Sequence, residues 1–493
     1  MSPHPDAPAT ADTTKQELDR LLDAAVAAAA DWAWRSPADR AEVLERVADA
    51  LDDAGAELIP LAASESHLPT ARVTGELGRT TFQLRMFADA LREGSFLEVI
   101  VERADPDTPL GPRPDLRRTL IPLGPVAVYA ASNFPFAFSV AGGDTASAWA
   151  AGCPVVLKAH PGHPRLSRRT AAIISAALAE TGVSAGVFGL VEGMDAGVAL
   201  IQDPRISAGA FTGSVGGGRA LFDLAAARPE PIPFYGELGS INPAVVTAAA
   251  VRARGPEIAQ GYVGSFTLGV GQFCTKPGLL FLPTGHGLEP ALLAAVDEVG
   301  AAPLLYDGVA ARYDEIGSEL ARTPGVRVLK SGAQQGLEAS PTLLAVDGDA
   351  FRAAVAVLTE ECFGPTSILV SYSDIDDLAG LLALVPGSLT ATVHAEESDF
   401  DRLDPVIRAM TARAGRLVFN GWPTGVAVSW AQQHGGPYPA TTAPHTSVGV
   451  TAMRRFQRPV TYQGFPAPLL PPALADDNPL GIVRRVDGEL GRH

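Results

Sequence analysis

The fold is decided by a run that begins VAVYA (126–130), AGGDTASAWAAG (141–152), PVVLKA (154–159). It continues with SRRTAAIISAALAETG (167–182), GVFGLVEG (186–193), AGVALIQDP (196–204) and SAGAFTGS (207–214). Short apolar segments typical of buried strands therefore alternate with small-residue or amphipathic segments typical of helices. This alternation predicts a parallel, doubly wound sheet with helices on both of its faces.

A second series of the same kind lies between about residues 240 and 430. It includes GLLFLP (278–283), PALLAAVDEVGAA (290–302), TSILVSYS (366–373) and RLVFNG (416–421). The start of the chain instead predicts three helices. One covers residues 14–33, one begins at the N-cap pattern Ser36-Pro37, and one covers 75–92. The Pro-rich stretch 105–122 then predicts an excursion from the α/β parts.

The chain has 493 residues, a formal net charge of −17 and 47% hydrophobic residues. Its length suits two large domains with extensions. Because so acidic a chain repels phosphate backbones and anionic surfaces, we expect no nucleic-acid partner and no membrane association. The N-terminus shows no secretory signal, and the three cysteines form no CxxC pair. We therefore expect a cytoplasmic protein.

The cysteine Cys274 differs in context from the other two. It lies in GVGQFCTKPG, a loop-like stretch between glycines and a proline, where a thiol can be exposed and reactive. Cys153 in AAGCPVV and Cys362 in EECFGP have the character of small packing residues. A lone cysteine is more often a buried core residue, so the loop context alone makes Cys274 a candidate nucleophile.

Two other polar residues lie among small and apolar neighbours. Glu237 in FYGELGSINP can activate water as a general base, and we expect burial to raise the pKa of its carboxyl. Asn133 in ASNFP carries an amide that can donate to an oxyanion. Each residue taken alone is also compatible with an ordinary loop or turn position.

A Gly-rich turn, FTGSVGGG (211–218), follows a predicted strand and opens a predicted helix. It lacks the GxGxxG fingerprint, but free N–H groups at a helix start can still hold a phosphate. The stretch GVSAG (182–186) matches a nucleophile elbow, yet a helix precedes it and a strand follows, the reverse of what an elbow needs. His160 and His163 have no carboxylate or cysteine nearby, so we expect no metal site.

Six segments together resemble the aldehyde dehydrogenase superfamily and occur in that family's order: SNFPF, LKAHP, FTGS, ELG, GQFCT and ECFGP. The resemblance covers about residues 14–485 and implies an α/β fold with two doubly wound, Rossmann-like domains plus an oligomerisation arm. It implies a cofactor-binding domain over 1–108 and 123–238, a catalytic domain over 239–430, and an arm and C-terminal segment over 109–122 and 431–493. A homodimer or homotetramer is the implied assembly.

The resemblance also implies the role of each site residue. Cys274 is then the nucleophile, Glu237 the general base and Asn133 the oxyanion donor, with His434 as an additional active-site histidine. The cofactor contacts fall on Lys158, His160, Phe211, Gly213, Ser214, Glu361 and Phe363. The implied activity is NAD(P)-dependent oxidation of an aldehyde to a carboxylate through a thioester on Cys274.

The expected adenosine ribose site departs from the common pattern. Many relatives read KPxE, with the Glu on the ribose hydroxyls, whereas this chain reads Lys158-Ala159-His160-Pro161. Without that acid the 2′-phosphate of NADP meets no local repulsion, and His160 adds a donor, more so when protonated. We therefore expect NADP as the cofactor, with NAD also usable.

Three longer segments are similar to one branch, the α-ketoglutaric semialdehyde (2,5-dioxovalerate) dehydrogenases: FSVAGGDTASAWAAGCPVVLKAHPGHP, ARPEPIPFYGELGSINP and HGGPYPATT. The implied reaction converts 2,5-dioxopentanoate to 2-oxoglutarate. A long-chain or broad-specificity NADP-dependent aldehyde dehydrogenase is the alternative, because VSWAQQ before His434 departs from the branch. Glu237 argues against CoA-dependent acylation, and Cys274, Glu237 and Asn133 together argue against a catalytically silent member.

Overall fold

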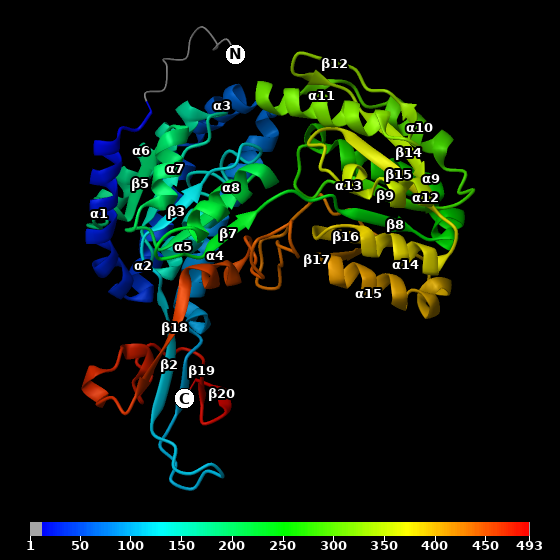
Figure 1. The fold of residues 1–493 in the computed structure, drawn as a ribbon. Helices are drawn as coiled ribbons and strands as arrows, with labels where there is room; N and C mark the ends of the chain where they lie inside the picture. The colour runs from blue at the N-terminus through cyan, green and yellow to red at the C-terminus, as the bar shows by residue number, and fades with distance from the viewer. Residues whose placement is uncertain (1–11, 493) are drawn as a thin grey trace.

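The structure is a computed structural model that describes residues 12–492. Figure 1 shows two α/β lobes beside one another and an arm that projects from the first lobe. The chain passes from the first lobe (blue to green) into the second (green to gold), and a returning segment (orange) leads back to the arm. The predicted architecture of two α/β parts and an arm is confirmed.

The first lobe contains a five-stranded, fully parallel sheet in the order β5-β4-β3-β6-β7. Its strands are β3 Val126–Tyr129, β4 Val155–Lys158, β5 Phe188–Val191, β6 Ala208–Thr212 and β7 Phe234–Glu237. The chain begins in the centre at β3, moves outward to β5, then crosses back to β6. Ligand crevices form where the order reverses, outside the carboxyl ends of the strands. Here that point lies between β3 and β6, next to Asn133 and Gly213.

Helices cover both faces of this sheet (Figure 1). They are α1 Lys15–Trp34, α2 Pro37–Asp53, α3 Gly55–Ser66, α4 Thr70–Glu93, α5 Gly143–Ala151, α6 Pro164–Glu180, α7 Met194–Gln202 and α8 Val215–Ala226, with the 3-10 turns η1 Ser95–Leu97 and η2 Ala185–Val187. Ser36 caps α2 and Pro37 begins it, as predicted. Helix α3 was not predicted, because it contains Pro60 and begins at Gly55. Helix α4 begins at Thr70 rather than near residue 75.

The second lobe contains a seven-stranded sheet in the order β11-β14-β15-β9-β8-β16-β17, parallel except at the β11–β14 edge. The strands are β8 Pro243–Val246, β9 Leu279–Pro283, β11 Arg327–Lys330, β14 Thr342–Asp347, β15 Thr366–Tyr372, β16 Ser388–His394 and β17 Ala414–Phe419. A small sheet holds β10 Ala302–Pro303, β12 Gln334–Gln335 and β13 Glu338–Ala339. The helices are α9 Ala248–Thr267, η3 Leu268–Gly271, α10 Glu289–Asp297, α11 Asp307–Arg322, α12 Gly348–Ala353, α13 Val355–Leu358, α14 Ile375–Leu384, η4 Glu397–Arg402 and α15 Asp404–Arg413.

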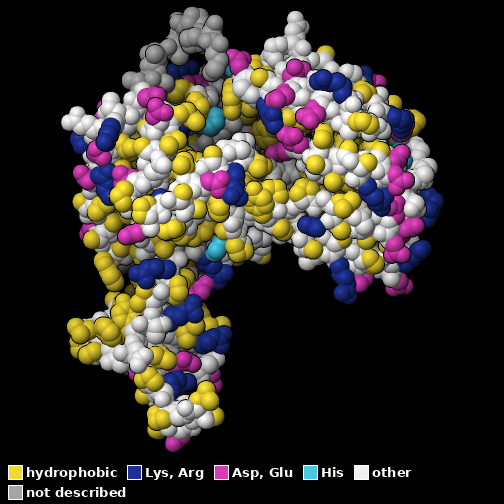
Figure 2. All heavy atoms as spheres, in the orientation of Figure 1, with side chains coloured by type: hydrophobic (Ala, Val, Ile, Leu, Met, Phe, Trp, Pro, Cys, Tyr) yellow, Lys and Arg dark blue, Asp and Glu magenta, His cyan; other side chains and the backbone are white. Residues whose placement is uncertain are grey.

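The arm contains a fourth sheet, in the order β18-β2-β1-β19-β20. It joins β1 Ile100–Glu102, β2 Leu116–Pro122, β18 Gln457–Gln463, β19 Arg484–Val486 and β20 Glu489–Gly491, with η5 Val450–Phe456, η6 Ala467–Leu469 and η7 Pro472–Leu474 along the C-terminal segment. Hydrophobic side chains gather on its surface (Figure 2), among them Leu110, Phe465, Leu469 and Leu490. Across residues 12–492, no helix is both long and apolar enough to span a membrane.

Candidate active site

Cys274 lies in the loop between η3 and β9, and the loop is shaped by three consecutive residues with positive φ. These are Gly269, Val270 and Gly271, at 57°, 58° and 67°. A Cβ on Gly271 would lie 2.2 Å from the Gly364 carbonyl oxygen, so glycine alone allows this close approach. Cys274 is partly exposed, whereas Cys153 and Cys362 are buried, so the thiol singled out from sequence is the accessible one.

Two buried side chains fasten this loop to the rest of the second lobe. Asn242 Nδ2 donates to the carbonyl oxygens of Cys274 at 2.7 Å and Lys276 at 2.9 Å. Asn242 Oδ1 accepts from Ser240 Oγ at 2.6 Å. Lys276 Nζ donates to the carbonyl oxygens of Cys362, Gly364 (3.0 Å) and Thr366 (3.1 Å). Lys276 thereby links the Cys274 loop to the segment that carries Glu361.

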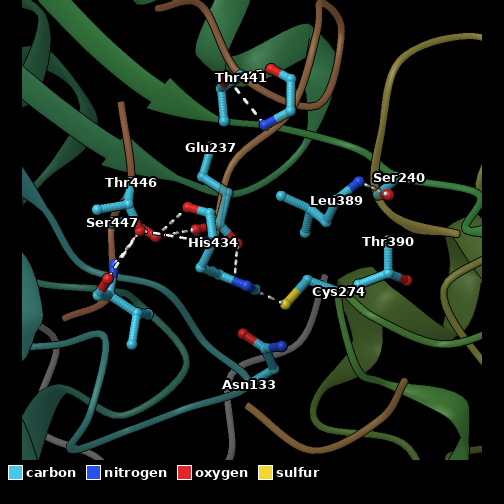
Figure 3. A network of polar contacts seen from close by, with 12 residues as sticks. Asn133, Glu237, Ser240, Cys274, Leu389, Thr390, His434, Thr441, Thr446 and Ser447 are labelled. Carbon is cyan, nitrogen blue, oxygen red and sulfur yellow. Dashed lines mark hydrogen bonds and ion pairs between the residues drawn. The ribbon is translucent and has the colours of Figure 1, made fainter. Parts of the chain in front are cut away.

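Glu237, His434 and Cys274 converge on one point (Figure 3). Glu237 ends β7, and its Oε1 lies 3.0 Å from His434 Nε2. Its other oxygen, Oε2, accepts from Ser447 Oγ at 2.6 Å. The same His434 Nε2 lies 3.6 Å from Cys274 Sγ. Because one ring nitrogen makes both contacts, His434 Nε2 can exchange a proton with the thiol or with the carboxylate.

The charges around this trio favour an ionised carboxylate and a protonated thiol. Burial acts to raise the pKa of Glu237, but the charge and hydrogen bond of His434, with bonds from Ser447 and Cys274, outweigh it and hold the pKa below its usual value. The expectation of a raised Glu237 pKa is therefore wrong, although burial does act in that direction. Burial, followed by the negative charges of Glu237 and Glu361, raises the pKa of Cys274 well above its usual value. The resting thiol thus needs a proton acceptor, and the Glu237–His434 pair is next to it.

Asn133 follows β3 and lies beside the thiol and the imidazole (Figure 3). Its Nδ2 donates to the Gln272 carbonyl oxygen at 3.1 Å, which fixes the amide against the Cys274 loop. An amide nitrogen has two hydrogens, and the second finds no acceptor among residues 12–492. That hydrogen can serve an oxygen bound next to Cys274.

A cavity of about 340 Å³ opens beside Cys274 and His434. One wall is the face of α4 that carries Arg72, Gly75, Glu76 and Arg79. Three aromatic rings, from Phe134, Phe138 and Phe273, form the apolar part of the lining. The cavity can therefore hold a small, partly apolar molecule against the thiol.

Several residues predicted for the cofactor lie along the carboxyl edge of the first sheet. Lys158 ends β4, Phe211 lies near the end of β6, and Gly213 is followed by Ser214, which caps α8 by accepting from Gly217 N at 3.2 Å. Lys158 is 8% exposed, and within residues 12–492 its ammonium group has no hydrogen bond or ion pair at normal contact distance. A buried cation without a partner, next to an open helix N-terminus, fits a phosphate-bearing dinucleotide.

His160 is placed beside Lys158 but is not available as a cation. Its Nδ1 accepts from Gly162 N at 3.0 Å, and its ring packs on Tyr306 at 5.5 Å. Burial, with the nearby His163 and Lys158, lowers the pKa of His160 well below its usual value. The expectation that a protonated His160 assists NADP is therefore wrong, since the ring is neutral at neutral pH.

Glu361 and Phe363 reach toward the first lobe from the second. Glu361 Oε2 lies 3.1 Å from the place where a Cβ on Gly239 would stand. Phe363 packs against the hydrophobic core of the first lobe. Burial raises the pKa of Glu361 to about 7, against the charge of Lys276. Both residues thus lie at the boundary where a bound dinucleotide would meet the second lobe.

Sequence reasoning missed six residues of this site: Arg72, Glu76, Arg79, Asn242, Lys276 and Ser447. Asn242 and Lys276 belong to motifs that were quoted, ELGSIN and CTK, and their polar side chains among apolar neighbours were the available signal. The α4 residues had only their helical spacing, which does not reveal a cavity.

A Rossmann-type sheet that faces a thiol, an imidazole and a carboxylate defines a dinucleotide-dependent oxidoreductase with a cysteine at its active centre. The model of the aldehyde dehydrogenase family matches residues 7–438, and the chain belongs to this family. It therefore oxidises an aldehyde to a carboxylate with NAD(P).

Two curated relatives cover nearly the whole chain. One is alpha-ketoglutaric semialdehyde dehydrogenase 2 of Azospirillum brasilense, 46% identical over 98% of this chain and 94% of its own length. Another is alpha-ketoglutaric semialdehyde dehydrogenase of Acinetobacter baylyi, 42% identical over 97% of this chain and 92% of its own. Among solved structures, 1-pyrroline-5-carboxylate dehydrogenase from Thermus with bound NAD shares the fold, with a TM-score of 0.76, 22% identity, and coverage of 92% and 86% of the two chains.

Proposed function

We propose that this chain oxidises α-ketoglutaric semialdehyde (2,5-dioxopentanoate) to 2-oxoglutarate. The observation that carries the proposal is the small cavity beside Cys274, which combines aromatic rings with arginines on α4 and so suits a short aldehyde with an anionic end. The names of the relatives that are 46% and 42% identical support the same substrate. A long-chain aldehyde is the alternative, but a cavity of about 340 Å³ with charged walls favours a short polar one.

We assign the nucleophile to Cys274 and the proton acceptor to the Glu237–His434 pair. The pair takes the thiol proton, and the thiolate forms a bond to the aldehyde carbon. The second amide hydrogen of Asn133 and the Cys274 N–H then hold the oxyanion. When bound, NAD(P) would accept the hydride that leaves the aldehyde carbon, so that a thioester remains on Cys274.

Deacylation uses the same pair in a second turn. After the first proton has gone to solvent, the ionised Glu237 takes a proton from water, and the resulting hydroxide attacks the thioester carbon. The C–S bond breaks, the acid leaves as a carboxylate, and Sγ recovers a proton. Ser447 holds the Glu237 oxygen that His434 does not, so the carboxylate keeps its orientation in both steps.

We also propose that the cofactor-binding part lies within residues 1–108 and 123–238, and the catalytic part within 239–430. Strand β1, Ile100–Glu102, falls inside the first of these bounds but pairs in the arm sheet. Lys158 and the α8 N-terminus with Phe211, Gly213 and Ser214 would hold the adenosine and pyrophosphate portions. Glu361 and Phe363 would meet the nicotinamide end, and neutral His160 would pack beside the adenosine ribose. The unpaired ammonium group of Lys158 supports NADP as a cofactor used at least as well as NAD, since the 2′-phosphate adds negative charge at that point.

The arm, over 109–122 and the C-terminal segment within 431–493, is proposed to join copies of the chain into a dimer or tetramer. Its exposed Leu110, Phe465, Leu469 and Leu490 support this, because apolar groups gathered on one projecting element favour contact with another chain. Three unpaired cysteines support a reducing, cytoplasmic location. Light scattering behind a sizing column measures the assembly directly.

The substrate is tested by steady-state kinetics on the purified full chain with NAD and NADP. We expect the highest kcat/KM for α-ketoglutaric semialdehyde, lower values for butanal and hexanal, and the lowest for decanal. A higher kcat/KM for decanal would replace the proposal with the long-chain alternative. A preference for NAD above tenfold, about 1.4 kcal/mol, would overturn the proposal for the ribose site.

A further inference from the structure

One face of α4 forms a charged wall of the cavity that holds Cys274. Arg72, Gly75, Glu76 and Arg79 follow one another at the spacing of a single helix stripe. Arg72 and Arg79 lie seven residues, or about 10 Å, apart along the helix. Gly75 between them leaves open space, since a Cβ there would meet no atom within 4 Å. Two arginines therefore border the same cavity, about two helical turns apart.

Arg72 has its charge balanced within the protein. Its guanidinium lies 2.6 Å from Oε2 of the buried Glu76 and stacks over the Phe134 ring at 4.4 Å. Glu76 Oε1 in turn accepts from the backbone N–H groups of Phe136 at 2.8 Å and Ala137 at 3.0 Å. The Arg72–Glu76 pair is thus a neutral unit that shapes the wall and has little charge left for a ligand.

Arg79 has no such partner. Within residues 12–492 no carboxylate lies at ion-pair distance from it, and its Nε is buried without a hydrogen-bond partner. Its guanidinium rests near the rings of Phe134 and Phe138, at 5.8 and 5.7 Å from their centroids. A buried guanidinium donor normally has an acceptor, so this one leaves a place for an anion that arrives with the ligand.

We propose that Arg79 binds the carboxylate of the aldehyde substrate and so determines that the enzyme prefers short aldehydes with an anionic far end. The inference rests on the proposed function and adds the residue that selects the substrate. The planar guanidinium matches a carboxylate with two parallel hydrogen bonds, and a neighbouring 2-oxo oxygen can accept a third. The aromatic rings of the cavity then flank the methylene groups between the carboxylate and the aldehyde carbon at Cys274.

A competing role for Arg79 is to stabilise the Cys274 thiolate, because its positive charge acts to lower the pKa of that thiol. The two roles differ in what they do to an uncharged aldehyde. An arginine that binds the substrate carboxylate affects the charged substrate alone. Loss of an arginine that stabilises the thiolate lowers activity on every aldehyde and slows alkylation of the thiol.

The test compares wild type with Arg79→Gln and Arg79→Lys, using α-ketoglutaric semialdehyde and pentanal, an uncharged aldehyde with the same number of carbons. The matched control is Arg85→Gln, which removes a charge from the same helix where Arg85 pairs with Asp49 and Asp52 away from the cavity. The measured quantity is the ratio of kcat/KM for the charged over the uncharged aldehyde. Melting temperatures confirm that each variant is folded.

We expect the ratio to fall about 100-fold in Arg79→Gln and about tenfold in Arg79→Lys. The fall should come chiefly from a higher KM for the charged aldehyde, because the variants lose charged hydrogen bonds to its carboxylate. It should stay unchanged in Arg85→Gln. Glutarate should protect Cys274 of wild type from iodoacetamide and should lose this protection in Arg79→Gln, a readout that needs no turnover and no cofactor.

Three results would overturn the inference or its basis. An equal fall for both aldehydes, with slower alkylation, would assign Arg79 to the thiolate. An unchanged ratio and unchanged protection by glutarate would remove Arg79 from substrate recognition while leaving the proposed function intact. A wild-type enzyme that prefers pentanal would overturn the proposed function itself, whatever the variants do.

Discussion

Replacing Glu237 by Gln separates the two halves of the proposed reaction. The amide keeps the size of the carboxylate and can still meet His434 at 3.0 Å and Ser447 at 2.6 Å, so one charge is lost with little change of packing. Removing a general base costs about 10²- to 10⁴-fold in rate, and we expect the steady-state kcat to fall within that range. The free energy of unfolding should fall by less than about 3 kcal/mol, since the charged hydrogen bond is weakened and neither partner loses it entirely.

The acylation half should respond differently, because Glu237 raises the pKa of Cys274 through its charge and its hydrogen bond. Without that charge the thiol ionises at lower pH, and iodoacetamide should alkylate Cys274 faster in Glu237→Gln than in wild type at pH 7. His434 remains beside Cys274 to take the thiol proton, so stopped-flow absorbance should show a burst of about one NAD(P)H per active site, followed by slow turnover. A steady-state rate equal to wild type, or slower alkylation of the variant, would refute the reasoning.

Three further outcomes follow from the same geometry. Cys274→Ala should abolish NAD(P)H production. Cys153→Ala and Cys362→Ala should retain NAD(P)H production and a melting temperature within a few degrees of wild type. Turnover by Cys274→Ala would rule out a thioester on Cys274. Asn242→Ala should lower kcat by about tenfold or more, since it frees the Cys274 and Lys276 carbonyls and costs about 2 kcal/mol or more of stability. The control is Asn420→Ala, because Asn420 bonds the Ala395 backbone and not the Cys274 loop. The stabilisation that Glu237 adds to the fold should be complete above its unfolded pKa of about 4.5 and be lost as pH falls through its lower folded pKa. The free energies of unfolding of wild type and Glu237→Gln should therefore converge at acid pH. Plots of free energy against pH that stay parallel would contradict the lowered pKa.

Parts of this architecture could be predicted from the sequence because they depend on local patterns. The strands VAVY and VVLK are short, apolar and bounded by turn residues, and their alternation with helices fixes a parallel sheet. Ser36 and Pro37 give a helix start that needs no tertiary information. The fold of both lobes therefore followed from periodicity, and the family followed from the order of six motifs.

Other features depend on contacts between distant residues and carry no local signal. The lowered pKa of Glu237 comes from His434 and Ser447, which lie about two hundred residues away in the chain. The neutral state of His160 comes from its burial, to which the ring of the distant Tyr306 contributes, and from the charges of His163 and Lys158. The charge of Arg79 matters only because Glu76 is already paired with Arg72, a fact that helical spacing does not reveal.

The catalytic side chains come from three parts of the chain, and these parts are not equally coupled. The segment that carries His434 and Ser447 is fastened to β7 by the bonds Leu238 N to Ala440 O at 2.8 Å and Thr442 N to Gly236 O at 3.0 Å. Glu237 and His434 therefore form one unit. Cys274 belongs to the second lobe and meets that unit through its thiol, at 3.6 Å from His434 Nε2 and by a hydrogen bond to Glu237.

Any shift of one lobe relative to the other would therefore change the distance from Cys274 to the pair while leaving the pair itself intact. The anchors of the Cys274 loop, Asn242 and Lys276, should consequently affect the formation of the thioester, because that step needs the thiol close to its proton acceptor. Variants of Ser447, which donates to Glu237 Oε2 and to the His434 carbonyl oxygen, should affect hydrolysis of the thioester. The division of labour between the lobes thus predicts which half of the reaction each supporting residue serves.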